Sequence, residues 1–274
     1  EGFNEMNFLS YLNNMVQDEI NNHHNKWQNY NYRLGADFFL AKHHTLGFLA
    51  SGGANFFDNS SFNRITLANE NTPADIDSIL VANTNADNDR KQQTYNLNYR
   101  FDNAQGRSFN VDLDYGNYRN NSKRYQPNRY YDASEQNLLT EIINSFDTPT
   151  DIDIYTFQAD YEDNLWGGTL GAGTKLSWVV SDNTFLFYDV ANSVPVRNDR
   201  KSNRFEYDEK VYAGYLSYAR DLGKKWKFSA GLRAEQTDAK GDLQAFLPEL
   251  QEPPVLHNYL SWFPNAGLTW NLAE

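Results

Sequence analysis

The residues that could support catalysis or bind a metal are few and poorly grouped. No serine, histidine and aspartate are arranged as in a hydrolase motif. The histidines include two adjacent pairs, and adjacent side chains on a strand point to opposite faces, which disfavours a shared metal ion. With no carboxylate evident to orient their rings, we interpret the histidines as solvated residues of loops or short turns. The five are His23, His24, His43, His44 and His257.

Acidic residues offer two further candidates for chemistry. Asp87 and Asp89 lie in a segment, 83–89, with oxygen ligands at alternate positions, as in calcium loops. The segment lacks the glycine and the bidentate glutamate of an EF-hand, so we interpret it as a hydrophilic loop that binds calcium weakly at most, and we predict no metal site.

Two pairs of carboxylates, Asp112 with Asp114 and Asp160 with Glu162, each share one face of a predicted strand. Glycosidase chemistry needs two carboxylates at a defined separation across a bound sugar. Pairing with arginine or lysine side chains of neighbouring strands along a water-filled lumen is their more ordinary use. We therefore predict no catalytic residue, no cofactor and no enzymatic activity.

The elements that position these residues are strands. Residues 27–40 alternate between apolar side chains, such as Tyr32, Leu34 and Phe38, and polar ones, such as Arg33 and Asp37. A period of two places the two sets on opposite faces of one strand. The alternation recurs at 94–101, 108–116, 155–162, 226–237 and 262–272, and more weakly at 45–54, 168–180 and 209–220. The pattern predicts about nine strands.

Composition narrows the class of protein. The 274 residues carry a net charge of -12, no cysteine and 15% aromatic residues, with a mean hydropathy of -0.75. This charge argues against a nucleic-acid partner, which requires a basic surface. The absence of cysteine excludes disulfides and thiolate sites. No apolar run approaches the roughly 18–20 residues of a membrane helix.

The lengths of the connections indicate the architecture. Short turns near 41–44, 102–107, 163–167 and 221–225 alternate with long polar segments near 55–90, 119–151, 181–208 and 239–258. This alternation is typical of an antiparallel, up-and-down transmembrane β-barrel with short periplasmic turns and long extracellular loops. We expect residues 1–26 to be an extracellular loop or the remnant of a preceding strand, and residues 27–274 to form barrel strands.

The two faces of the predicted strands differ in the way such a barrel requires. Aromatic residues near the strand ends match interfacial girdles, and the apolar face is expected to contact outer-membrane lipid. The polar face is expected to line a wet lumen. The predicted lumen-facing residues are Arg33, Asp37, Arg100, Asp112, Asp114, Asp160, Lys175, Arg233 and Glu235.

The long polar segments hold weaker candidates. Apolar residues at helical spacing predict loop helices at 134–146 and 5–20, with an extension of the strands as the alternative. Aromatic side chains of the loops either stack on a sugar or chelator ring or pack on one another. The candidates for substrate binding are Tyr125, Tyr130, Tyr131, Tyr188 and Tyr207.

Several segments resemble a known family. Residues 31–39 with 44–48, residues 155–161, the Gly-Leu-Arg-Ala-Glu sequence at 231–235 and the Trp-Phe-Pro-Asn-Ala-Gly-Leu sequence at 262–268 look like strands of outer-membrane barrels of the Bacteroidetes type. The chain is similar to the barrel of a TonB-dependent receptor of the outer membrane protein β-barrel family. The resemblance implies a barrel of about 22 strands around a plug. Since 271–274 lacks a terminal aromatic residue and no plug-like segment is recognised, we expect an internal piece of such a barrel.

The resemblance implies a function in the outer membrane: import of a bulky nutrient, such as a siderophore, a metal chelate or an oligomeric nutrient. The implied partners are lipid, the remainder of the barrel and its plug, TonB and a surface lipoprotein. A self-contained barrel, in the outer membrane or soluble, that serves as a binding or adhesion module is the first alternative. An outer-membrane hydrolase is the second.

Overall fold

The computed structural model describes residues 2–12 and 14–270, and almost all of them are in strands. The strands are β1 (Gly2–Leu12), β2 (Met15–Ala41), β3 (His44–Asn69), β4 (Ile76–Asp102), β5 (Ser108–Asp132), β6 (Leu138–Leu165), β7 (Gly168–Ala191), β8 (Val194–Arg197), β9 (Asn203–Leu222), β10 (Trp226–Ala245) and β11 (Val255–Trp270). A single 3-10 turn, η1 (Pro248–Leu250), interrupts the connection from β10 to β11.

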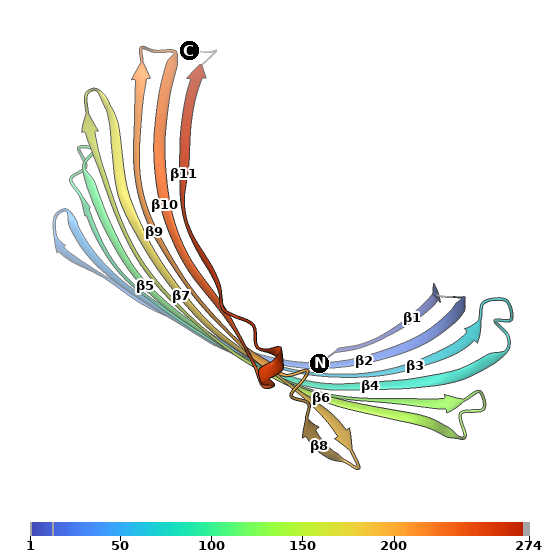
Figure 1. Ribbon diagram of the computed structural model, residues 1–274. Helices are drawn as coiled ribbons and strands as arrows, with labels where there is room; N and C mark the ends of the chain where they lie inside the picture. Colours follow the sequence, from blue (N-terminus) through green and yellow to red (C-terminus); the bar gives the residue numbers. More distant parts are fainter. Residues whose placement is uncertain (1, 13, 271–274) are drawn as a thin grey trace.

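The strands form one antiparallel sheet in which chain neighbours are also spatial neighbours. The order is β1-β2-β3-β4-β5-β6-β7-β9-β10-β11, with the short β8 paired to the end of β7. The sheet is a single bent layer whose turns gather at two opposite ends (Figure 1). Within the described residues β1 and β11 form its two edges, so the arc is open. The predicted all-β, up-and-down fold is confirmed, with eleven strands rather than nine.

The strands are much longer than the sequence pattern indicated. β2, β4 and β6 have 27, 27 and 28 residues, although a tilted strand crosses a bilayer in about 9–11. Four segments were expected to be long loops, and most of their residues belong to strands of the sheet instead. The segments lie near 55–90, 119–151, 181–208 and 239–258. The turns that remain are short, such as 70–75 and 133–137.

The two predicted loop helices are wrong. Residues 5–12 lie in β1 and residues 15–20 in β2, and the two strands pair with each other through contacts such as Phe8 with Glu19. Residues 138–146 begin β6 and pair with β5, for example Ile142 with Asn128. Apolar side chains occur on both faces of the sheet here, and this mixture imitates the spacing of an amphipathic helix. The structure shows the alternative, an extension of the strands.

The register brings like residues together in rows across the sheet. One row contains Phe48, Leu97, Leu113, Phe157, Leu176 and Tyr212. The adjacent row, on the opposite face, contains Gly47, Asn98, Asp112, Gln158, Lys175 and Ala213. We name the face of the first row the apolar face and that of the second the polar face, and keep these names along the whole length of each strand.

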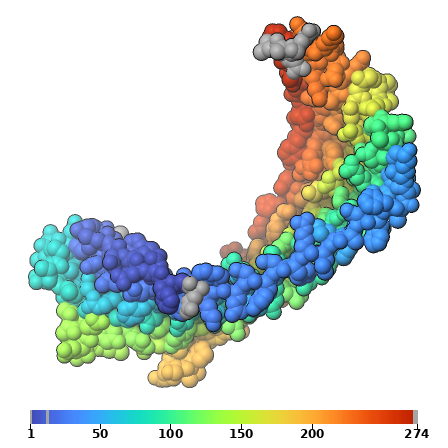
Figure 2. All heavy atoms as spheres, turned by 180° about the vertical axis from the view of Figure 1, so that it is seen from behind, coloured from blue at the N-terminus to red at the C-terminus, as the bar shows by residue number. Residues whose placement is uncertain are grey.

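The molecule is a thin, curved layer (Figure 2), and a single layer of strands buries little of either face. Among the described residues Ile79 is the only large side chain that is fully buried. Leu113 and Leu216, on the apolar face, are 46% and 55% exposed. An exposed apolar surface of this extent is expected to contact a lipid membrane or another protein. No helix in the described part of the chain is long and apolar enough to span a membrane.

An aromatic row divides each central strand into two parts. Tyr95, Tyr115, Tyr155 and Trp178 lie side by side on the apolar face, with ring centroids 6.2, 5.0 and 5.5 Å apart. The proximal half of each strand runs from this row to the short turns at 42–43, 103–107, 166–167 and 223–225. The distal half runs the other way, for instance from Leu138 to Ile154 in β6.

The polarity of the two faces reverses beyond the aromatic row. In the proximal half of β6 the apolar face carries Phe157 and Ala159, whereas in the distal half it carries Asp151 and Asp153. Ile154 of β6 and Val179 of β7, which pair with each other just beyond the row, lie on the polar face instead. The register is unbroken across the row, so the reversal belongs to the sequence. The two halves are therefore suited to different surroundings.

The distal turn at 133–137 supplies a prediction about pH. A hydrogen bond from the Asn137 side chain, 2.7 Å long, is the main cause that lowers the pKa of Asp132 to about 2, and Ser134 and the Gln136 amide donate to the same carboxylate. An unfolded aspartate has a pKa of about 3.9, so these bonds stabilise the turn above that pH and are lost as the pH falls towards 2. Asn137→Ala raises the Asp132 pKa, and the turn then opens at a higher pH.

A carboxyl chemical-shift titration of Asp132, with hydrogen exchange of the Gln136 amide, measures this effect. Asn128→Ala, in the adjoining strand, is the control and leaves the titration unchanged. An unchanged Asp132 pKa in Asn137→Ala would contradict the assignment.

Candidate functional site

The predicted polar residues share one face. Asp37, Asp112, Lys175 and Glu235 belong to a single row that crosses the sheet from β2 to β10. Arg100, Asp160 and Arg233 belong to the next row, and Arg33 and Asp114 have the same parity in their strands. The structure therefore brings all nine onto the polar face.

Asp160 is the centre of a hydrogen-bond network on this face. It accepts hydrogen bonds from the Tyr215 hydroxyl and from Gln158 Nε2, the latter at 2.8 Å. The Arg233 guanidinium lies over the Tyr215 ring, 5.6 Å from its centroid, and pairs with Glu235. Charge and hydrogen-bonding capacity on this part of the polar face are thus largely satisfied by contacts within a strand and, from Tyr215 of β9 to Asp160 of β6, across β7.

The expected ladder of ion pairs between the predicted residues is mostly replaced by other contacts. Asp114 accepts hydrogen bonds from Asn96 Nδ2 at 2.7 Å and Thr156 Oγ1 at 2.8 Å rather than from a cation. Arg100 pairs with Asp102 on its own strand, 2.9 Å away. The alternation of polar and apolar residues identified the face of the sheet but not the hydrogen-bond partners. Amide and hydroxyl groups, like arginine, can donate hydrogen bonds to a carboxylate.

A groove that the sequence analysis missed lies on the polar face of the distal half. It has a volume of about 370 Å³ and crosses β2 to β6. Its polar-face side chains are Asn29, Asn31, Asn55, Arg90, Gln92, Tyr118, Asn120, Thr150 and Ile152. We name it the amide groove. The alternating asparagines at 29 and 31 were visible in the sequence, but only the register shows that they meet Gln92 and Asn120.

The predicted substrate-binding tyrosines do not form one cluster. Tyr125, Tyr131 and Tyr188 lie on the apolar face by strand parity, whereas Tyr130 and Tyr207 lie on the polar face. The Tyr207 hydroxyl donates to Glu209 at 2.6 Å, and this hydrogen bond raises the pKa of Tyr207 to about 12. None of the five lines the amide groove.

The weak metal candidates lie within strands. Asp87 and Asp89 share the apolar face of β4, and Asp87 is flanked by Asp58 and Lys123. Within residues 2–12 and 14–270, no group of three or more histidine or acidic side chains is placed to hold a metal ion. His23 and His24 lie in β2, and His257 in β11, rather than in loops.

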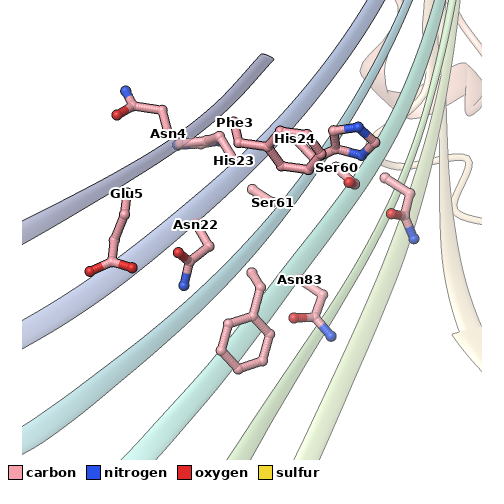
Figure 3. A pocket seen from close by; sticks show the side chains of 11 residues that line it. Phe3, Asn4, Glu5, Asn22, His23, His24, Ser60, Ser61 and Asn83 are labelled. Atoms are coloured by element: carbon pink, nitrogen blue, oxygen red, sulfur yellow. The ribbon is translucent and has the colours of Figure 1, made fainter. Parts of the chain in front are cut away.

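A second hollow, of about 570 Å³, lies between β1 and β4 in the distal half. Phe3 stacks on the His24 ring with centroids 4.4 Å apart, and Glu5, Asn22 and Asn83 stand apart on separate strands (Figure 3). Because these polar groups do not converge on one point, we do not assign a site there.

No curated protein matches the sequence. Among solved structures, the chain is similar to the ferric citrate transporter FecA in its unliganded form, with 12% identity and a TM-score of 0.46. The match covers 94% of this chain and 40% of the FecA chain, so this chain spans less than half of that structure.

The sequence also matches the model of a protein family. Residues 99–274, more than half of the chain, match the family described as the outer membrane protein beta-barrel family. This range includes the complete strands β5 to β11, which hold the Asp160 network and most of the aromatic row. The chain belongs to the outer membrane protein beta-barrel family, and its sheet is part of a barrel wall in the outer membrane.

Proposed function

We propose that this sheet is part of the barrel of a TonB-dependent outer-membrane transporter that imports a bulky nutrient. The observation that carries the proposal is the contrast between its faces in the proximal half. One face presents exposed leucine and aromatic side chains, and the other a network of charged and amide groups. A wall with lipid on one side and a wide, wet lumen on the other requires this contrast.

The aromatic residues support an orientation in which the apolar face meets lipid. Ten residues separate Tyr155 of the aromatic row from Trp166 in a short turn, close to the length of a tilted transmembrane strand. Trp166 is 76% exposed, and Trp226 stacks on Trp270 near the same end. Two aromatic belts at this separation are typical of the two membrane interfaces. In this orientation Arg33, Asp160 and the other predicted polar residues face the lumen.

The distal halves would then rise above the outer leaflet. The 17 residues of β6 from Leu138 to Ile154 correspond to about 55 Å of strand. On their apolar face Arg119 pairs with Asp151 at 2.9 Å and Arg204 with Asp182 at 2.5 Å, as expected of a surface in water. The short turns would lie on the periplasmic side.

The partners follow from the same proposal. The edges β1 and β11 would pair with further strands of the same barrel, because unpaired strand edges are templates for more strands. The lumen would hold a plug that TonB rearranges, and a surface lipoprotein would be an additional partner. The proposed nutrient is a siderophore, a metal chelate or an oligomeric nutrient, and no enzymatic step is proposed. The Bacteroidetes type remains a prediction from sequence.

The transport proposal predicts that uptake requires TonB. In cells that express the full-length receptor, uptake of labelled ferrichrome, ferric citrate or maltohexaose is expected to fall to background when the receptor gene or the tonB gene is deleted. Energy delivered through TonB is what moves the plug, so the two deletions have the same effect. The measurement is the initial rate of uptake of each compound.

Uptake that depends on the receptor but persists without TonB would contradict the proposal and favour a passive pore. The strain that carries the receptor gene on a plasmid is the control, and it should recover the original rate.

The orientation predicts unequal costs for lysine on the two faces. Val111 lies on the apolar face near the middle of the proposed span, and Asn110 lies next to it on the polar face. Val111→Lys is expected to lower the free energy of unfolding by about 2–4 kcal/mol, since it places a cation against acyl chains. Asn110→Lys is expected to cost less than about 1 kcal/mol. Urea unfolding of the full-length receptor in lipid vesicles measures both, and equal costs would contradict the proposed orientation.

A further inference from the structure

The amide groove lies where a ligand would enter the proposed lumen. Gln92 and Tyr118 are three residues beyond Tyr95 and Tyr115 of the aromatic row, or about 10 Å along each strand. The groove is on the polar face, which the proposed orientation turns towards the lumen. Its volume of about 370 Å³ is within the range of small-molecule sites.

The groove is rich in carboxamides and nearly free of charge. Its polar-face lining contains the side chains of Asn29, Asn31, Asn55, Gln92 and Asn120, and no carboxylate. Its one polar-face cation, Arg90, donates from Nε to Asn120 Oδ1 at 3.2 Å. Lys91 and Arg119 also border the groove, but by strand parity they belong to the opposite face, and Arg119 is paired with Asp151 there.

Part of this hydrogen-bonding capacity is unused. Asn29 and Asn55 bond to each other, whereas the side chains of Asn31 and Gln92 have no hydrogen-bond partner among the described residues. Gly53 leaves room for Asn31, because a Cβ at position 53 would collide with the Asn31 side chain and would lie 2.7 Å from the Tyr30 carbonyl oxygen. Tyr118, which is 36% exposed, adds a flat aromatic surface beside these amides.

These groups differ from what a charged ligand needs. A ferric chelate with several carboxylates would be matched by a cluster of arginine and lysine side chains, and a peptide terminus by an opposite charge. A carboxamide presents one acceptor and two donors side by side, so it can bond two neighbouring hydroxyl groups at once. An aromatic ring covers the apolar face of a sugar, since it combines a flat apolar surface with a polar group.

We propose that the amide groove binds a neutral, polyhydroxylated ligand, an oligosaccharide, at the entrance of the lumen. The proposal rests on the transport function proposed above and specifies its substrate class. Gln92 and Asn31 donate to and accept from sugar hydroxyls, and Tyr118 stacks on a pyranose ring.

The chain provides a matched pair of variants for a test. Gln92 and Gln93 are adjacent and both exposed, but they point to opposite faces of β4. Calorimetric titration of the purified full-length receptor with maltohexaose, cellohexaose and xylohexaose is expected to show binding of at least one. Gln92→Ala should weaken that binding roughly 3- to 10-fold, the effect of losing one or two hydrogen bonds. Gln93→Ala should leave it unchanged.

Tyr118 separates stacking from hydrogen bonding. Tyr118→Ala should weaken binding of the same hexasaccharide by roughly tenfold or more, whereas Tyr118→Phe, which keeps the ring, should retain most of it. Circular dichroism of each variant checks that the barrel is folded, and the Gln93→Ala and Tyr118→Phe receptors serve as folded references.

Two results would overturn the proposal. The first is that none of the three hexasaccharides binds, and the second is that Gln93→Ala weakens binding as much as Gln92→Ala does. TonB-dependent uptake of ferrichrome or ferric citrate, with rates unaffected by Gln92→Ala, would refute the oligosaccharide and leave the transport function intact. Loss of TonB dependence would instead refute the transport function.

Discussion

Backbone pairing between neighbouring strands is the constraint on which the rest of this structure depends. In a bilayer no water is present to satisfy an N–H or C=O group, so each strand has to be hydrogen-bonded along its length to its neighbours. The register from β4 to β11, which shifts between Tyr130 and Tyr131 of β5, provides this pairing and at the same time determines which side chains share a face. The apolar row of Leu97 and Leu113 and the polar row of Asp112 and Lys175 are both consequences of that register.

Because the register continues through the aromatic row, the same strands serve two environments. Tyr115 donates from its hydroxyl to Asp153 at 2.7 Å, and Trp178 donates from Nε1 to Asp208 at 2.8 Å, so both rings direct their polar atoms towards the distal half. Beyond this row acidic residues replace leucine on the apolar face, and isoleucine and valine appear on the polar face. A change in composition, without a turn or a break in the sheet, is therefore sufficient to end the membrane-facing surface.

This reversal also explains what could be predicted from sequence. Alternation identified the proximal halves, and with them the polar face of Arg100, Asp160 and Arg233, because lipid demands a strict contrast between the faces. Beyond the aromatic row both faces of the sheet can carry polar residues, because neither face contacts lipid there. The alternation of apolar and polar residues therefore weakens, or the apolar residues move to the other face. The distal halves consequently resembled loops. Near Leu138 and Ile142, with apolar residues on both faces, they resembled a helix. The terminal segment 271–274 lies outside the described residues.

The amide groove lies in the distal half, beyond the aromatic row, where the alternation of apolar and polar residues in the sequence is weak. Its side chains come from five strands, and Asn31 and Asn120 are 89 positions apart in the chain, so only the register unites them. The distal position of the groove also favours binding of a ligand. In the proximal half Asp160, Tyr215 and Arg233 satisfy one another, which leaves them little capacity for a ligand. Within the described part of the chain, the side chains of Asn31 and Gln92 have no hydrogen-bond partner. They lie at a level where a solute arrives still hydrated, so hydroxyl groups of the solute can replace water there with little cost.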